Sequence, residues 1–129
     1  VLKLGLKNIN AEFIITNPDG YDLDPKITKG VKIYSNQDEA FKGADFIYAK
    51  NWCSYENYGK VLRTDDEWII NDEKMNYTNN AKFMHCLPIR RNVVASDDVL
   101  DDKNSLVMIQ SRNRVFSTQA ILKQIIDDE

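Results

Sequence analysis

One short stretch, residues 83–92, gathers the only histidine of the chain, one of its two cysteines and two adjacent arginines around a proline. The imidazole of His85 can donate a proton, and the thiol of Cys86 can contact a substrate. Arg90 and Arg91 each carry a planar fork of donors that matches a carboxylate or a phosphate. The stretch therefore predicts a site for an anionic substrate just beyond a short buried strand.

A purely structural role is the alternative for this stretch. A buried strand could carry His85 as a satisfied core histidine and Cys86 as a small core residue. Two guanidiniums directly beyond a strand end favour the site, because the chain as a whole has a net charge of −3 and these cations make a local anion site. Arg91 and the following Asn92 could instead bond the backbone at a turn, and for these two residues both interpretations stay open.

Short apolar runs alternate with amphipathic stretches along the chain, a pattern typical of a mostly parallel sheet flanked by helices. The predicted fold class is α/β and Rossmann-like, with about four to five strands. The apolar runs predict strands at residues 12–16, 31–34, 45–49, 81–86 and 105–109. The third strand delivers Lys50, Asn51 and Trp52 to the sheet edge at which open α/β folds bind ligands.

Helices are predicted between and after the strands. Residues 37–42 predict a helix that Ser35 or Asn36 caps and Gly43 ends, and Ser96 caps a second short helix at 96–100. Residues 55–63 and 65–75 are polar and aromatic-rich, which is typical of helical or irregular structure. The last helix is predicted over about 113–126, with apolar residues at helical spacing that face a core or a partner: Val115, Ile121, Leu122, Ile125 and Ile126.

Composition narrows the class of protein. With 129 residues, 43% hydrophobic and 29% charged, the chain predicts one domain whose core needs no disulfides. An isoelectric point near 5.2 without a basic stripe disfavours nucleic acid as the main partner.

No apolar run reaches the roughly twenty residues that span a bilayer, and the first residues do not resemble a signal peptide, so a cytoplasmic location without a membrane partner is expected. Cys53, Cys86 and a single histidine offer neither a zinc set nor a disulfide framework, so both thiols are expected to be reduced and no metal is predicted.

The sequence His-Cys-Leu-Pro at 85–88, followed by basic residues, resembles the signature of the ornithine branch of the carbamoyltransferases. The resemblance extends upstream through 75–80 and downstream through 90–93, and Asn113-Arg114 also matches the family. It is strongest to the enzymes that act on N-acetylornithine or N-succinylornithine. It covers nearly the whole chain, but only the C-terminal, amino-acid-binding half of such an enzyme.

The resemblance implies transfer of the carbamoyl group from carbamoyl phosphate to the side-chain amine of an N-acylornithine, in arginine biosynthesis and without a cofactor. It implies His85, Cys86 and Arg114 as catalytic residues, with His85 donating to the carbonyl oxygen and Arg114 clamping carbamoyl phosphate. The Leu87–Pro88 peptide bond is expected to be cis. The residues implied to hold the substrates are Lys50, Cys86, Leu87, Arg90 and Arg114.

Two positions bear on the acyl group of the substrate. Ordinary ornithine enzymes carry an aspartate for the free α-amino group where this chain has Lys50. An acylated nitrogen carries no positive charge, so a cation at this position favours an N-acyl substrate. The N-acetylornithine enzymes have a lysine where this chain has Val94, which favours the succinyl group.

The family's Ser-Thr-x-Thr-Arg phosphate loop is absent from the chain, and residues 1–10 correspond to the helix after the first strand of the second domain. The resemblance thus implies an N-terminally truncated amino-acid-binding domain over 1–129, inactive alone, from an enzyme that is a homotrimer. A stand-alone, non-catalytic amino-acid-binding module is the alternative, favoured by the chain length. A nucleotide-binding domain is disfavoured, because the turn at 17–20 is Asn-Pro-Asp-Gly and not a glycine-rich loop.

Overall fold

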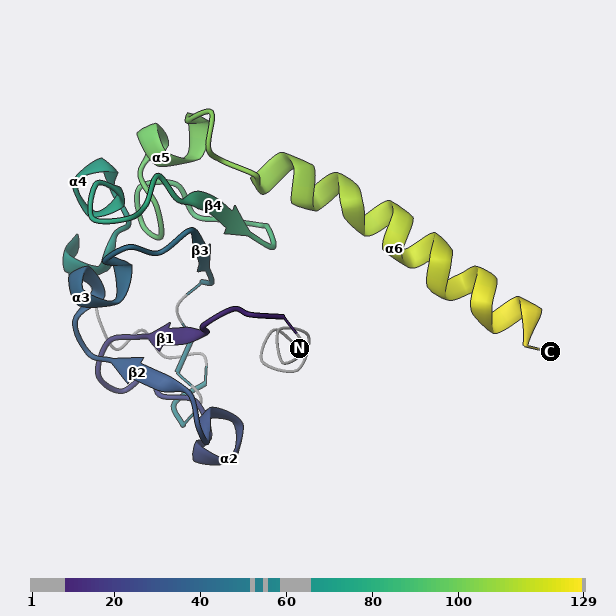
Figure 1. Ribbon diagram of the computed structural model, residues 1–129, viewed down its shortest axis with the longest axis horizontal. Helices are drawn as coiled ribbons and strands as arrows, with labels where there is room; N and C mark the ends of the chain where they lie inside the picture. Colours follow the sequence, from purple (N-terminus) through teal and green to yellow (C-terminus); the bar gives the residue numbers. More distant parts are fainter. Residues whose placement is uncertain (1–8, 52, 55, 59–65, 129) are drawn as a thin grey trace.

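The computed structural model describes residues 9–51, 53–54, 56–58 and 66–128. The strands are β1 (Ile14–Thr16), β2 (Lys32–Tyr34), β3 (Phe46–Ala49) and β4 (Lys82–His85). The helices are α2 (Pro25–Thr28), α3 (Gln37–Phe41), α4 (Asp72–Met75), α5 (Asp97–Asp101) and α6 (Val107–Asp127), with a short 3-10 helix η2 at Asp66–Trp68. The strands and short helices lie together, and α6 extends away from them (Figure 1).

Parallel pairing of strands confirms the predicted α/β class. β1 pairs with β2, and β3 pairs with β4, both in parallel. The four strands lie inside the ranges predicted at 12–16, 31–34, 45–49 and 81–86. They form two two-stranded sheets instead of one continuous sheet, because no strand within the described residues is hydrogen-bonded between the two pairs.

The fifth predicted strand, residues 105–109, is wrong. Ser105 makes a single parallel bridge to Phe83, and the chain turns into α6 at Val107. The N–H of Leu106 still donates to the Phe83 carbonyl at 2.8 Å, while the Leu106 carbonyl already accepts the N–H of Gln110 at 2.8 Å. A short apolar run suits a strand and a buried helix start equally well. The last helix begins at Val107, so its predicted start at 113 is also wrong.

Polar caps decide where the short helices begin. The Asn36 side chain accepts a backbone N–H of the first turn at 3.0 Å, so Asn36 and not Ser35 caps α3. Gly43 follows this helix with a φ of 71°, the left-handed conformation predicted for its end. Ser96 caps α5 through the N–H of Val99 at 3.4 Å, as predicted.

The core is built on one face of the β3–β4 pair. The register places Ile47 beside Phe83 and Ala49 beside His85. Side chains alternate across a strand, so these four residues share one face, and all four are buried. The apolar residues among them join a cluster that continues with Ala40, Phe41, Ile70, Ala81, Val94, Ala95, Val99 and Val107.

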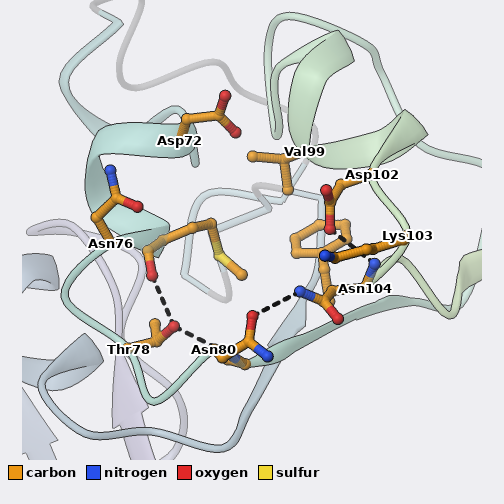
Figure 2. Close-up of a pocket in the computed structure, with 11 residues that line it drawn as sticks. Asp72, Asn76, Thr78, Asn80, Val99, Asp102, Lys103 and Asn104 are labelled. Carbon is orange, nitrogen blue, oxygen red and sulfur yellow. Dashed lines mark hydrogen bonds between the residues drawn. The ribbon is translucent and has the colours of Figure 1, made fainter.

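A polar cavity of about 490 Å³ lies at the amino end of β4, opposite the end that carries His85 (Figure 2). Its polar walls bond one another: the Asn104 amide donates to the Asn80 side-chain oxygen at 2.8 Å, and the Thr78 hydroxyl accepts the N–H of Ala81 at 3.0 Å. These two bonds fix the position of the cavity wall at the start of β4.

Helix α6 leaves most of its apolar residues uncovered. Val107 at its start is buried, but the five residues predicted to face a core or a partner are between 53% and 69% exposed: Val115, Ile121, Leu122, Ile125 and Ile126. The prediction that they pack in a core is therefore wrong within the described residues, and a partner is left as their expected cover. No helix in the described part of the chain has both the length and the apolar character needed to cross a membrane.

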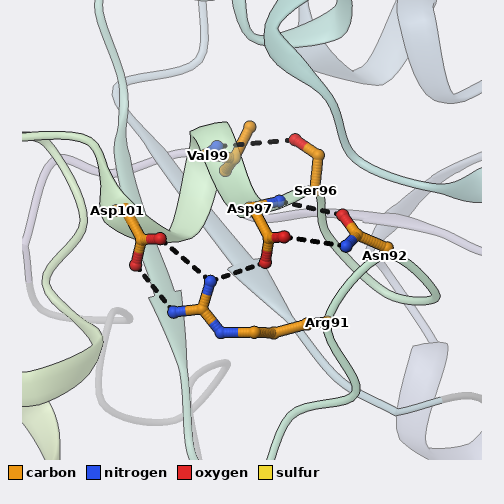
Figure 3. Close-up of polar contacts among 6 residues, drawn as sticks. All are labelled: Arg91, Asn92, Ser96, Asp97, Val99 and Asp101. Carbon is orange, nitrogen blue, oxygen red and sulfur yellow. Dashed lines mark hydrogen bonds and ion pairs between the residues drawn. The ribbon is translucent and has the colours of Figure 1, made fainter.

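The loop after β4 is fastened to α5 by a charged network (Figure 3). The Arg91 guanidinium donates to the carboxylates of Asp97 and Asp101, each at 2.6 Å at its shortest. The Asn92 amide donates to Asp97 at 2.9 Å and accepts the backbone N–H of the same residue at 3.0 Å. Hydrogen bonds from Arg91 lower the pKa of Asp97 and of Asp101. Of the two interpretations left open for Arg91 and Asn92, the structure supports the structural one.

Replacing Arg91 with alanine should lower the free energy of unfolding at neutral pH. It should also make that free energy fall less steeply as the pH becomes acidic. Both aspartates have folded pKa values below 3.8, so their stabilising effect is complete above 3.8 and is lost as pH falls through the lower folded values. The effect should be small, because the ion pairs are exposed. Denaturant unfolding measured from neutral to acid pH checks this. Arg91→Lys keeps the charge and loses the planar fork of donors, so its free energy of unfolding should lie between those of the wild type and Arg91→Ala. An unchanged pH dependence of unfolding in Arg91→Ala would contradict this account.

Two phenylalanines offer a matched test of where the core lies. Phe83 is 1% exposed on β4, whereas Phe116 is 63% exposed on α6. Phe83→Ala should cost about 3–5 kcal/mol of unfolding free energy. Phe116→Ala should change it by about 0.5 kcal/mol or less. Equal losses in the two variants, measured by urea unfolding, would show that α6 is covered in the isolated chain.

Candidate functional site

The carboxyl ends of β3 and β4 lie side by side and bring Lys50 next to Cys86. The last paired residues are Ala49 and His85, so Lys50 and Cys86 follow in register. The Lys50 ammonium donates to the Cys86 sulfur at 3.2 Å. The sequence placed both residues at strand ends, and the structure confirms that they meet.

His85 is held as a neutral hydrogen-bond donor. The side chain is 1% exposed, and its Nδ1 accepts the backbone N–H of Leu87 at 2.9 Å. A ring that accepts at Nδ1 and is neutral carries its proton on Nε2, and Nε2 is buried without a hydrogen-bond partner among the described residues. Burial, helped by the charge of Lys50, lowers the pKa of His85 below 6.5. The imidazole therefore presents an unused N–H near neutral pH.

The backbone that follows His85 has an unusual shape. Leu87 has a φ of 51°, in the left-handed region that a leucine rarely occupies, and the Leu87–Pro88 bond is cis, as predicted. Uncommon backbone conformations of this kind occur often at functional sites. The Leu87 N–H points at the His85 ring because of this turn, so the backbone selects the protonation state of the side chain.

Asn51 is a site residue to which the sequence assigned no role. Its amide nitrogen donates to the Pro88 carbonyl at 3.0 Å and ties the end of β3 to the loop after β4. The signal available in the sequence was its place directly after Lys50 at a strand end. Trp52, the third residue predicted at this edge, lies outside the described residues.

The two predicted arginines are not packed against His85. Arg90 is exposed, and within the described residues its guanidinium forms no hydrogen bond or ion pair, which leaves it free for a ligand. Arg114 is also exposed, and its guanidinium donates to the Ser111 hydroxyl of the same helix at 3.4 Å. Because α6 begins at Val107, Arg114 lies further along the helix than predicted. The roles of both arginines remain predictions.

The side chains at this edge carry positive charge and lack acidic partners in the described residues. Lys50 bonds a thiol rather than a carboxylate, and Arg90 lies on the same loop as the cis proline. Cys53 and Cys86 are both free thiols in the structure. Within the described ranges no group of three or more histidine, cysteine or acidic side chains could hold a metal ion. The arrangement can bind an anion and donate one hydrogen bond from a buried imidazole.

Comparison with known proteins identifies relatives of this arrangement. The chain is 48% identical over 119 residues to an N-succinylornithine carbamoyltransferase of Bacteroides fragilis, covering 91% of the chain and 37% of that relative. It is 42% identical over 91 residues to an N-acetylornithine carbamoyltransferase of Xylella fastidiosa, covering 66% of the chain and 27% of that relative. The structure resembles a crystal structure of acetylornithine transcarbamylase complexed with acetylcitrulline, with a TM-score of 0.74 and 28% identity over 87% of the chain and 39% of that chain.

The chain spans 37% of the length of each of two N-succinylornithine carbamoyltransferases that it matches. Independently, the family model for the Asp/Orn binding domain of aspartate/ornithine carbamoyltransferase matches residues 2–125, which include both strand pairs and the His-Cys-Leu-Pro loop. On that match, the chain belongs to the aspartate/ornithine carbamoyltransferase family.

Proposed function

We propose that this chain is the amino-acid-binding part of a carbamoyltransferase that acts on an N-acylornithine, with N-succinylornithine preferred. The observation that carries the proposal is the Nε2–H of His85, which is buried and has no partner in the described part of the chain, next to the Lys50–Cys86 pair. The preference for succinyl is supported by the names of the two relatives at 48% identity. Val94 adds support, because it is fully buried and supplies no cation where the N-acetylornithine enzymes have a lysine.

In the proposed reaction the side-chain amine of the substrate attacks the carbonyl carbon of carbamoyl phosphate. A C–N bond forms, the bond from carbon to the phosphate oxygen breaks, and the amine loses a proton. The Nε2–H of His85 donates to the carbonyl oxygen, where negative charge develops. The remaining contribution of the protein is to hold two polar reactants in line.

Substrate recognition is proposed to rest on the cations at the strand ends. Lys50 and Arg90 bind the carboxylates of the N-acylornithine, because neither cation is neutralised by an acidic side chain among the described residues. Cys86 and the backbone of Leu87 contact the amino-acid portion of the substrate. Arg114 binds carbamoyl phosphate, which requires that its helix be placed against the remainder of the enzyme.

The proposal extends to the parts of the enzyme that would complete the site. A further domain with a phosphate-binding loop holds carbamoyl phosphate, and the complete enzyme is a homotrimer in the cytoplasm. The exposed apolar residues of α6 are consistent with a helix that is covered in a larger assembly. Arginine biosynthesis is the proposed setting.

An assay with three acceptors tests the function. The complete protein that contains this chain is mixed with carbamoyl phosphate and with N-succinylornithine, N-acetylornithine or ornithine, and the citrulline-type product is measured. Lys50 suits the uncharged α-nitrogen of both acylated acceptors, so both should react better than ornithine. The highest kcat/KM is expected for N-succinylornithine, because its second carboxylate can bind a cation of the site. The 129-residue chain alone should form no product. Product from none of the three acceptors would contradict the proposal, and product from the chain alone would contradict its dependence on a further domain.

His85→Ala in the complete enzyme should lower kcat by about 10²–10³, because one donor to the developing oxyanion is lost. Below the folded pKa of His85, which lies below 6.5, a proton on Nδ1 displaces the Leu87 N–H that this atom accepts, so the acidic fall in kcat due to this residue should occur below pH 6.5. The fall should be absent in the variant. Steady-state kinetics across pH measures both effects.

Arg90→Ala is the matched control for that experiment. Its side chain is free in the described structure, so its loss should raise KM for the acylornithine and leave kcat nearly unchanged. A His85 variant with kcat within a few-fold of the parent enzyme would remove this residue from the mechanism.

A further inference from the structure

Lys50 and Cys86 form a close pair of an amine and a thiol on adjacent strands. Their Nζ and Sγ atoms are 3.2 Å apart, and the pairing of Ala49 with His85 immediately before them holds both backbones in place. The pair is not closed off from solvent, since Lys50 is exposed and Cys86 is half-buried. A small oxidant can therefore reach the sulfur while the amine stays within bonding reach.

We propose that Lys50 and Cys86 are a site of reversible oxidative cross-linking, in which hydrogen peroxide joins the cysteine sulfur to the lysine nitrogen as a sulfenamide. In the first step peroxide oxidises the thiol to a sulfenic acid and is reduced to water. In the second step the unprotonated amine attacks the sulfur, the S–N bond forms, and the S–O bond breaks. The departing hydroxide takes a proton from the nitrogen and leaves as water. One thiol, one amine and one peroxide thus give one S–N bond and two waters.

Lys50 is the partner that the geometry favours for the oxidised sulfur. A sulfenic acid commonly condenses with a nearby thiol or a backbone nitrogen. The backbone nitrogen of Leu87, next in the chain, already donates to Nδ1 of His85. The other thiol, Cys53, contacts the carbonyl of its neighbour Ser54 at 3.8 Å and makes no described contact with Cys86.

The cross-link would close the amino-acid half of the site. It removes the positive charge of Lys50 and the free thiol of Cys86 together, and a thiol reductant would restore both. This consequence rests on the proposed function, whereas the cross-link itself depends only on the 3.2 Å contact. A bound acylornithine should protect the pair by covering Lys50.

Mass spectrometry of the complete protein that contains this chain tests the proposal. Wild type and Cys53→Ser are treated with hydrogen peroxide at mildly alkaline pH, where more of the lysine amine is unprotonated. After tryptic digestion, residues 43–60 should be joined to residues 83–90 with the loss of two hydrogen atoms and without cleavage after Lys50. The link should form in both proteins and should be reversed by dithiothreitol.

Variants separate the cross-link from other oxidation products. Lys50→Arg and Cys86→Ser should both abolish the link, and thermal melting confirms that each variant is folded. If the linked peptide of the wild-type protein is cleaved after Lys50 and is missing from Cys53→Ser, the link is a disulfide between Cys53 and Cys86. That result would overturn the proposal. Oxidation of Cys86 to a sulfinic or sulfonic acid with Lys50 still cleaved would also overturn it. The readout is a mass, so it holds whether or not the protein proves to be a carbamoyltransferase.

Discussion

Parallel pairing of β3 with β4 is the constraint on which the site depends. The register that sets Ile47 beside Phe83 in the core also sets Ala49 beside His85, so burial of apolar side chains aligns the two strand ends. Lys50 and Cys86 meet because they are the next residues on each strand. A shift of one residue in β4 would turn His85 toward the other face, and a shift in either strand would separate the lysine from the thiol.

The loop after β4 carries the chemistry because several unrelated contacts hold it. Asn51 fixes the Pro88 carbonyl, and the N–H of Ile70 donates to the Val94 carbonyl at 3.0 Å. Arg91 attaches the same loop to the start of α5. A left-handed leucine is unfavourable by itself and persists only where its surroundings hold it in place, and these contacts provide that support. The neutral state of His85 follows from this backbone, because the Leu87 N–H occupies Nδ1.

Helix α6 differs from the rest of the chain in what it contributes. Its first residues belong to the core, since Val107 is buried and Gln110 donates to the Tyr48 hydroxyl at 3.1 Å. Beyond these residues the helix projects away with its apolar side chains uncovered (Figure 1). Apolar area of this extent is uncommon on a surface that has no partner. The proposed role of Arg114 in binding carbamoyl phosphate therefore depends on contacts between this helix and the remainder of the enzyme.

Local patterns in the sequence determined the α/β class, the four strand positions, the cap Ser96 and the stretch around His85, because periodicity and capping act over a few residues. The tertiary structure decided which neighbouring groups are engaged and which are free. Arg90 and Arg91 are adjacent and chemically identical, yet only Arg91 meets Asp97 and Asp101 across the loop. The apolar run at 105–109 suited a strand or a helix. After a single bridge from Ser105 to Phe83, the Leu106 carbonyl accepts the N–H of Gln110, and this bond starts the helix. Such outcomes depend on distances between residues remote in the chain, which no local pattern encodes.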